Sequence, residues 1–427
     1  MKVFIETFGC WLNKGESDIM KTLLRERGHE VVDTPEKADT VIVNTCAVRG
    51  DTETKIFREL TRLEALRKKT GFRLVVTGCL TNVRPKSILE IAPEASLVEP
   101  DSLERIVEVV ESEKQLLLLR SYPRMRNVLP EFEGGVTYIL PVQSGCLGAC
   151  SFCIEWVTRG LGVKSYPLDS IVKAVENAVK KGAKEVYLVG QDLATYGYDL
   201  GTNLTALIEE ILQTVKGEYR IRIGMMEPML LRSQIDGLLT LARDERLYKY
   251  FHIPVQSGDD NVLKLMNRKY TVSEYRDLVG RIRSQGLSSS IATDIIVGFP
   301  GEDENAFNNT LRLLGELMFD KVHIARYTLR PFTKGYLMKG PPEPLKKLRS
   351  KIATELSFRI AYEINRKYLG MTKEVLINSV SMRGDFTGRT PEYKPVVFKD
   401  YDLELGAFVK ARIVDASPLH LVGEVVD

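Results

Sequence analysis

The sequence predicts an α/β protein of three parts: an N-terminal parallel α/β domain over residues 1–120, a partial (β/α)6 barrel over 136–368, and a small antiparallel β barrel over 369–427. Residues 121–135 are expected to link the first two. Three observations support this division: apolar runs alternate with helical patterns near the start, six strand-like runs recur in the middle, and short alternating runs fill the end. At roughly 150 residues per domain, a chain of 427 residues suits three domains.

The N-terminal prediction depends on the runs KVFIETF, TVIVN and RLVVT, which alternate with helical patterns near 16–28 and 52–70. Such alternation is typical of parallel strands covered by helices. In the second helical pattern Ile56, Leu60 and Leu63 recur at the spacing of one helix face. That face is therefore expected to pack on the sheet.

The barrel prediction depends on six runs: VTYILPVQ, EVYLVGQD, YRIRIGMMEP, YKYFHIPVQ, SSIATDIIVGFP and KVHIARYTLR. Repeated strand-helix units favour a parallel sheet curled toward a barrel, and six units are fewer than the eight of a closed one. A helical stretch to about residue 369 follows three nearby prolines. The runs KEVLINSV, KPVVFKD, AFVKARIVDA and HLVGEVV then predict the antiparallel β barrel.

The composition is that of an ordinary globular protein, with 44% hydrophobic residues and a net charge of +3 from 60 basic and 57 acidic side chains. A polyanionic partner would therefore have to bind local patches. No apolar run approaches the roughly 18 residues that cross a bilayer, and the start does not resemble a signal peptide. We expect a cytoplasmic protein with no membrane partner, in which six cysteines serve metal or redox chemistry.

Cys146, Cys150 and Cys153 form a C-x3-C-x2-C triplet directly after the first predicted barrel strand. Three thiolates at this spacing can hold three irons of a 4Fe-4S cluster and leave the fourth iron open. The alternatives are a structural zinc site or inert thiols. A zinc site wants four protein ligands, and no histidine lies at a nearby ligand spacing.

Cys10, Cys46 and Cys79 each come directly after a predicted strand of the N-terminal domain. Parallel strands end at the same edge of a sheet, so the three thiols are expected to converge into a second three-cysteine site. The alternative is three buried structural cysteines.

These features resemble the radical S-adenosylmethionine (SAM) methylthiotransferases, which have a three-cysteine N-terminal domain, a radical SAM barrel and a C-terminal TRAM domain. The motifs that carry the resemblance are TFGCWLNKGESDIM, NTCAV, VVTGCL, GCLGACSFCI, GQDLATYG, HIPVQSGDDNVLKLMNRKYT and DIIVGFPGE. Phe152, the aromatic residue before the third cysteine of the triplet, also resembles the radical SAM pattern.

The resemblance implies two 4Fe-4S clusters, one on each cysteine trio, and SAM as cofactor. The barrel cluster would cleave SAM to a radical that abstracts hydrogen, and the auxiliary cluster would hold the sulfur to be inserted. An electron donor such as a ferredoxin or flavodoxin and a sulfur donor are implied partners. Phe152 and the polar or glycine positions at strand ends are candidates for binding SAM or substrate: Gln191, Asp192, Glu227, Gln256, Ser257 and Gly298. The alternative is that these polar groups merely satisfy loop backbone.

The family divides between tRNA and ribosomal-protein substrates. The start of the chain and GCLGACSFCI look most like the archaeal and eukaryotic branch, which adds a methylthio group at C2 of N6-threonylcarbamoyladenosine next to the anticodon of tRNA. The alternatives are a ribosomal-protein aspartate or isopentenyladenosine in tRNA as substrate. A non-catalytic iron-sulfur factor that binds RNA is the alternative from another class. In the TRAM-like region, Arg383 and Arg389 are candidate RNA contacts.

Overall fold

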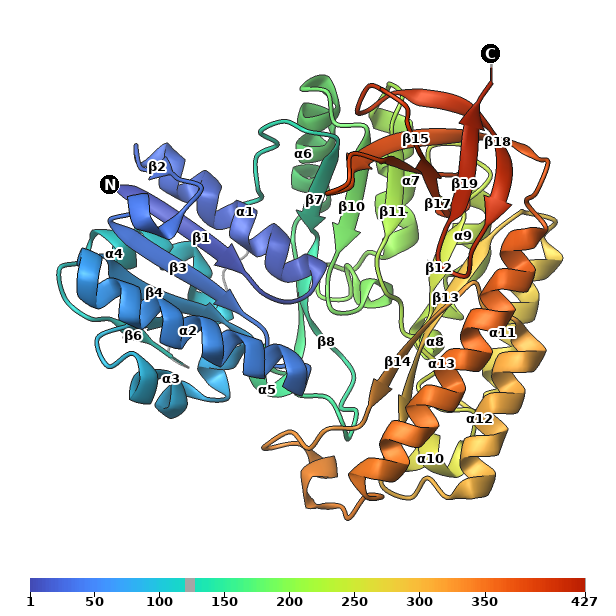
Figure 1. Ribbon diagram of the computed structural model, residues 1–427, viewed down its shortest axis with the longest axis horizontal. Helices are drawn as coiled ribbons and strands as arrows, with labels where there is room; N and C mark the ends of the chain where they lie inside the picture. Colours follow the sequence, from blue (N-terminus) through green and yellow to red (C-terminus); the bar gives the residue numbers. More distant parts are fainter. Residues whose placement is uncertain (120–126, 427) are drawn as a thin grey trace.

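The structure is a computed structural model that describes residues 1–119 and 127–426. It consists of an N-terminal α/β domain beside an open barrel, with a small β barrel covering the end at which the barrel strands begin (Figure 1). Contacts across that end include the backbone N–H of Lys249, which donates to Pro391 O, and an ion pair between Arg220 and Glu374. The three predicted parts are therefore present, and they pack against one another.

The N-terminal domain is a six-stranded sheet in the order β2-β1-β3-β4-β5-β6, and every pair in it is parallel. The three predicted strands are confirmed, whereas the sequence analysis did not find the short strands. The strands are β1 (Lys2–Thr7), β2 (Glu30–Val31), β3 (Thr40–Thr45), β4 (Arg73–Gly78), β5 (Ser96–Val98) and β6 (Leu117–Leu118).

The helices of this domain cover its sheet. Ile56, Leu60 and Leu63 are fully buried, as the periodicity of α2 predicts. The first helix begins at Trp11, five residues before the predicted start. The helices are α1 (Trp11–Glu26), η1 (Pro35–Lys37), α2 (Gly50–Thr70), η2 (Cys79–Asn82), α3 (Pro85–Ile91), η3 (Pro100–Arg105) and α4 (Ile106–Glu111).

All six predicted barrel strands are confirmed. They form two parallel sheets in the orders β11-β10-β7 and β12-β13-β14, and a parallel bridge between Met225 and His252 joins the two. The strands are β7 (Thr137–Pro141), β10 (Glu185–Val189), β11 (Arg220–Ile223), β12 (Tyr250–His252), β13 (Ser290–Val297) and β14 (Lys321–Arg326). A short hairpin of β8 (Gln143–Cys146) and β9 (Gly162–Ser165) follows β7 and carries the cysteine triplet.

Helices pack outside these strands (Figure 1). The main ones are α6 (Leu168–Lys180), α7 (Leu204–Thr214), α9 (Ile235–Leu241), α11 (Val272–Ser284), α12 (Glu304–Leu317) and α13 (Glu343–Arg366). Short ones fill the loops: α5 (Glu155–Thr158), η4 (Leu193–Thr195), α8 (Pro228–Leu231), α10 (Asp260–Leu265) and η5 (Lys334–Leu337).

The C-terminal domain is a closed barrel in the order β15-β16-β17-β19-β18. The expectation that it is purely antiparallel is wrong in one place, because β17 and β19 pair in parallel. Since β18 lies between them in the chain, β19 returns in the direction of β17, and closing the barrel brings the two together. The strands are β15 (Thr372–Val380), β16 (Phe386–Arg389), β17 (Pro395–Phe398), β18 (Phe408–Ala416) and β19 (Leu421–Val425). The sequence analysis did not find β16.

Residues 121–126 of the predicted linker lie outside the described residues. The remainder, 127–135, has no helix or strand and is held by side chains of both flanking domains. Glu104 accepts the backbone N–H of Asn127, and Tyr138 donates to Pro130 O. Within the described residues, no helix is both long and apolar enough to cross a membrane.

Candidate functional site

Cys10, Cys46 and Cys79 lie at one edge of the N-terminal sheet. They follow β1, β3 and β4, which are neighbours in the sheet, so the parallel topology brings their three loops together. The approach is close: a side chain at Gly9 would place its Cβ 2.8 Å from Cys46 Cβ. The expected convergence of these cysteines is therefore found.

Burial, with a contribution from the nearby Cys79, raises the pKa of the Cys10 and Cys46 thiols to about 12. Cys10 keeps solvent-accessible surface, but the protein packed around its sulfur desolvates the thiolate. Its Sγ–H donates to Asn13 Oδ1 over 3.3 Å. A metal that binds these sulfurs must therefore displace protons, as thiolate ligation requires.

Cys146, Cys150 and Cys153 lie on a loop whose N–H groups point at their sulfurs. Gly148 N–H donates to Cys146 Sγ over 3.2 Å, Glu155 N–H to Cys153 Sγ over 3.4 Å, and Arg268 Nη1 to Cys150 Sγ over 3.2 Å. Each sulfur thus has a donor suited to a thiolate. A Cβ at Gly148 would lie 3.3 Å from Cys146 Sγ and 3.6 Å from Cys150 Sγ, so the glycine leaves room between the two sulfurs.

Both trios therefore fit a 4Fe-4S cluster held by three protein sulfurs in the chemistry of the donor atoms, and at the barrel trio Gly148 leaves space beside two of the sulfurs. In the cluster-free chain burial keeps Cys146 protonated as well, because it raises the pKa of this thiol to about 12. Burial also raises the pKa of the Cys153 thiol.

Glu155 lies close to both trios. Its charge raises the pKa of Cys10, Cys46 and Cys79 of the N-terminal domain and of Cys146 and Cys153 of the barrel loop. A charge acts strongly only on groups near it. The two trios therefore lie near one carboxylate.

Arg159, from the same loop, lies close both to Glu155 and to the auxiliary trio. It interacts electrostatically with Cys79 and Cys10 and forms an ion pair with Glu16 of α1. Sequence reasoning gave no role to Glu16, Glu155 or Arg159. Their one signal is that Glu155 and Arg159 follow Cys153 closely in the chain.

The candidate residues at the ends of β10 and β11 surround the barrel trio. Gln191 Oε1 accepts Gly145 N–H over 2.8 Å and so holds the strand that ends at Cys146. Asp192 accepts the backbone N–H of Glu227 over 2.9 Å, and burial raises the pKa of its carboxyl to about 7. Glu227 pairs with Arg268 over 3.3 Å. These residues support the cysteine loop, and direct contact with SAM stays a prediction.

The other candidates are spread more widely. Phe152 packs edge-on against Phe299, with ring centroids 6.4 Å apart. Gln256 adopts a positive φ of 70°, and its buried Oε1 has no hydrogen-bond partner. Ser257 is buried and accepts Asp259 N–H. The space at Gly298 is taken by Lys346, whose Cγ lies 2.4 Å from where a Cβ would sit, so packing already explains that glycine.

A cavity of about 420 Å³ opens where the three domains meet. Trp11, next to Cys10, and Arg49, close to Cys46, line it from the N-terminal domain. Arg389 lines it from the C-terminal barrel. Of the two candidate RNA contacts, Arg389 thus faces this cavity, whereas Arg383 lies on an exposed turn.

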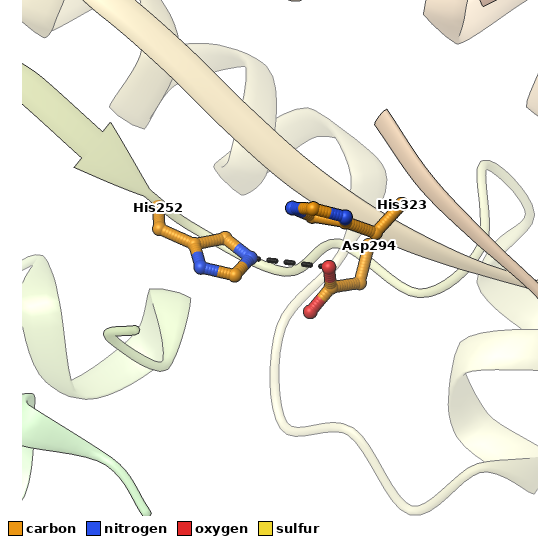
Figure 2. Close-up of side chains that lie close together, drawn as sticks. All are labelled: His252, Asp294 and His323. Atoms are coloured by element: carbon orange, nitrogen blue, oxygen red, sulfur yellow. Dashed lines mark hydrogen bonds and ion pairs between the residues drawn. The ribbon is translucent and has the colours of Figure 1, made fainter. Parts of the chain in front are cut away.

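His252, Asp294 and His323 gather on the barrel side of the cavity (Figure 2). Their ligating atoms lie within 4.8 Å of one another, and His252 Nε2 is 3.1 Å from Asp294 Oδ1. Burial, His252 and the cations Lys321 and Arg49 together lower the pKa of His323 to about 4, against the opposing effect of the Asp294 carboxylate. The two cations disfavour a divalent cation here, whereas Asp294 favours one.

Three family models match successive parts of the chain. They are described as "Uncharacterized protein family UPF0004" over residues 2–99, "Radical SAM superfamily" over 140–314 and "TRAM domain" over 366–426. The matches coincide with the three structural domains and cover all six cysteines.

Relatives match along the full length. A protein of Pyrococcus horikoshii named "Probable threonylcarbamoyladenosine tRNA methylthiotransferase" is 39% identical over 100% of both chains. One of the same name from Methanocaldococcus jannaschii is 37% identical over 100% of this chain and 97% of its own. A "tRNA-2-methylthio-N(6)-dimethylallyladenosine synthase" of Fusobacterium nucleatum is 33% identical over 100% of both chains.

Among solved structures, the radical SAM methyltransferase TsrM of Kitasatospora setae shares the fold with a TM-score of 0.57 and 14% identity. The match covers 79% of this chain and 74% of that one.

Proposed function

The chain belongs to the radical SAM methylthiotransferases that act on tRNA, and from this premise we propose that its substrate is N6-threonylcarbamoyladenosine in tRNA, modified at C2. The enzyme is a transferase that uses two 4Fe-4S clusters and SAM. When bound, these cofactors supply the one-electron chemistry that activates a carbon–hydrogen bond and the sulfur that replaces the hydrogen.

The single observation that carries the mechanism is that the two cysteine trios lie near the same carboxylate, Glu155, and are therefore near each other. We assign Cys146, Cys150 and Cys153 to the radical cluster, and Cys10, Cys46 and Cys79 to the auxiliary cluster. Hydrogen removal and sulfur insertion occur at one substrate carbon, so the groups that perform them must be close together. The proximity of the two trios supports this assignment.

The residues of the chain hold this arrangement. Arg159 and Glu16 tie the barrel loop to the N-terminal helix, and Gln191 fixes the strand that ends at Cys146. Trp11, 39% exposed and next to Cys10, lines the cavity. Lys14 Nζ lies 4.2 Å from its ring centroid, and the exposed part of the ring is available to an unstacked adenine. Arg383, on an exposed turn of the TRAM domain, is available to a phosphate of the tRNA.

The choice of N6 substituent is supported by the names of the archaeal relatives, which are more similar than the bacterial one named for dimethylallyladenosine. The second candidate substrate is dimethylallyladenosine, which is the isopentenyladenosine alternative named above. It is supported by the name of that bacterial relative.

The test is to supply the anaerobically reconstituted holoenzyme with SAM, reductant and a sulfur source, together with one of three tRNAs. These carry threonylcarbamoyladenosine, isopentenyladenosine or unmodified adenosine at the same position. Nucleoside mass spectrometry should find the methylthio adduct only on the first. An adduct only on isopentenyladenosine would overturn the proposal, and so would modification of a ribosomal protein in place of all three tRNAs.

A further inference from the structure

The cavity shared by the three domains is rich in cationic groups that the fold itself does not neutralise. Arg222, Lys321 and Arg389 line it, from β11, β14 and the end of β16. Among the described residues none of the three forms an ion pair with a carboxylate. By contrast, Lys394 in the same cavity pairs with Asp320 over 2.6 Å. The other carboxylate in the wall, Asp294, already contacts His252.

Arg222 is held in place by aromatic rings. It is buried, and its guanidinium lies 5.1 Å from the ring centroids of Tyr187 and Tyr393 and 5.2 Å from that of Tyr250. The guanidinium of Arg389 also lies over Tyr393, 4.6 Å from its ring centroid. The buried Nε atoms of both arginines have no hydrogen-bond partner. Buried donors without a partner are uncommon, and they are expected where a ligand supplies the acceptor.

The three cations also repel one another. Lys321 keeps solvent-accessible surface, but the protein packed around its ammonium group desolvates the charge and lowers its pKa, and the charges of Arg389 and Arg222 act in the same direction. Positive groups brought together without a counter-ion cost free energy, which a bound anion would recover. A planar, bidentate donor such as Arg222 suits a carboxylate in particular.

We propose that Arg222, Lys321 and Arg389 form a carboxylate-binding subsite for the substituent on N6 of the target adenosine. The inference rests on the proposed function, because the threonyl part of the N6-threonylcarbamoyl group ends in a carboxylate whereas a dimethylallyl group is neutral. Trp11 lines the same cavity and keeps exposed surface, so a base placed against it can extend its N6 group toward the three cations. The subsite thereby selects the anionic substituent.

The test compares substrates that differ only at that carboxylate. One tRNA carries threonylcarbamoyladenosine, and the other carries its methyl ester. Lys321→Gln and Arg389→Gln remove single cations, and because Lys321 is exposed its variant should fold normally. Each should lower kcat/KM for the free acid by about tenfold or more, as expected for a lost charge-assisted hydrogen bond. The rate with the ester, already slow in the unaltered enzyme, should change little.

The matched control is Arg383→Gln, which removes an exposed cation of the same domain that does not line the cavity. This variant should lower kcat/KM for both tRNAs equally, as the loss of a phosphate contact does. Lys321→Gln and Arg389→Gln could also lower kcat/KM for the acid and the ester tRNA to the same extent, or weaken binding of unmodified tRNA to that extent. In either case these cations bind RNA phosphate, and the subsite is refuted. The holoenzyme could also contain metal beyond the iron of the two clusters. If His323→Ala removed that additional metal, the anion site would equally be refuted.

Failure of the subsite is distinguishable from failure of the proposed function. If the unaltered enzyme does not modify threonylcarbamoyladenosine, the proposed function fails. If it does, but Lys321→Gln and Arg389→Gln keep its preference for acid over ester, only the subsite fails.

Discussion

Arg159 and Glu16 form a buried ion pair that joins the loop of the radical cysteines to the first helix of the N-terminal domain. Arg159 Nη2 donates to Glu16 Oε2 over 2.8 Å, and the two residues are 1% and 3% exposed. Because Arg159 also interacts with Cys79 and Cys10, this pair sets how the two trios face each other.

Glu16→Gln is expected to lower the free energy of unfolding by about 3–5 kcal/mol, because it removes the carboxylate charge that pairs with the buried Arg159 guanidinium. Chemical denaturation of the holoprotein measures the change. The control is Glu176→Gln, which breaks the exposed pair with Lys180 and should cost less than about 1 kcal/mol. Equal losses in the two variants would contradict the role assigned to the buried pair.

Single cysteine substitutions should distinguish the roles of the two trios. Cys146→Ala should remove about half of the reconstituted iron and abolish SAM cleavage to 5′-deoxyadenosine, because it takes away a proposed ligand of the radical cluster. Cys46→Ala should also remove about half of the iron, yet leave some cleavage while abolishing methylthio transfer. Iron analysis and product chromatography distinguish them. Methylthio transfer retained by Cys46→Ala would exclude the auxiliary trio from the reaction.

Trp11→Ala is expected to raise the KM for tRNA, since stacking of one base on an aromatic ring contributes about 1–3 kcal/mol. Trp11→Phe keeps an aromatic face and should restore most of the affinity. Cleavage of SAM without tRNA should be unaffected in both variants. An equal loss in Trp11→Phe and Trp11→Ala would argue against stacking.

Gly78→Ala should destabilise the N-terminal domain. Gly78 has φ +91°, and a Cβ there would lie 2.4 Å from Thr45 O, immediately before Cys79. The backbone strain alone costs on the order of 1–3 kcal/mol, and the clash adds to it. Gly71→Ala is the matched control, because Gly71 has φ +82° but open space around it. Thermal unfolding should show the larger loss for Gly78→Ala, and the reverse order would refute the steric argument.

The Glu6 carboxyl should make the stability of the fold depend on pH. Burial raises the pKa of its carboxyl to about 7, and the charge of Glu59 raises it further. A carboxyl whose pKa is raised on folding binds its proton more tightly in the folded state, so it destabilises the fold progressively as pH rises from about 4.5 through 7. Glu6→Gln should therefore raise Tm at pH 8 relative to the unaltered protein and have little effect near pH 4.5. An equal change in Tm at both pH values would contradict this assignment.

The sequence by itself determined the local parts of this protein. Apolar runs separated by helical patterns indicated the strands of the first two domains, because a buried parallel strand is apolar along its length. The cysteines at the ends of β1, β3 and β4 could be grouped in advance, because parallel strands end at a common edge. The short strand β16, with glycine and polar residues, gave no such signal.

Only the tertiary structure decided which side chains from different domains meet. Arg222 and Lys321 look from the sequence like ordinary charged residues of separate strands, and Arg389 like a surface contact for RNA. Packing of the C-terminal barrel against the strand starts brings the three into one cavity and leaves them without carboxylate partners among the described residues. Glu155 likewise comes close to both trios only when the N-terminal domain docks on the barrel. Such charge groupings depend on long-range packing, which local hydrophobic patterns do not encode.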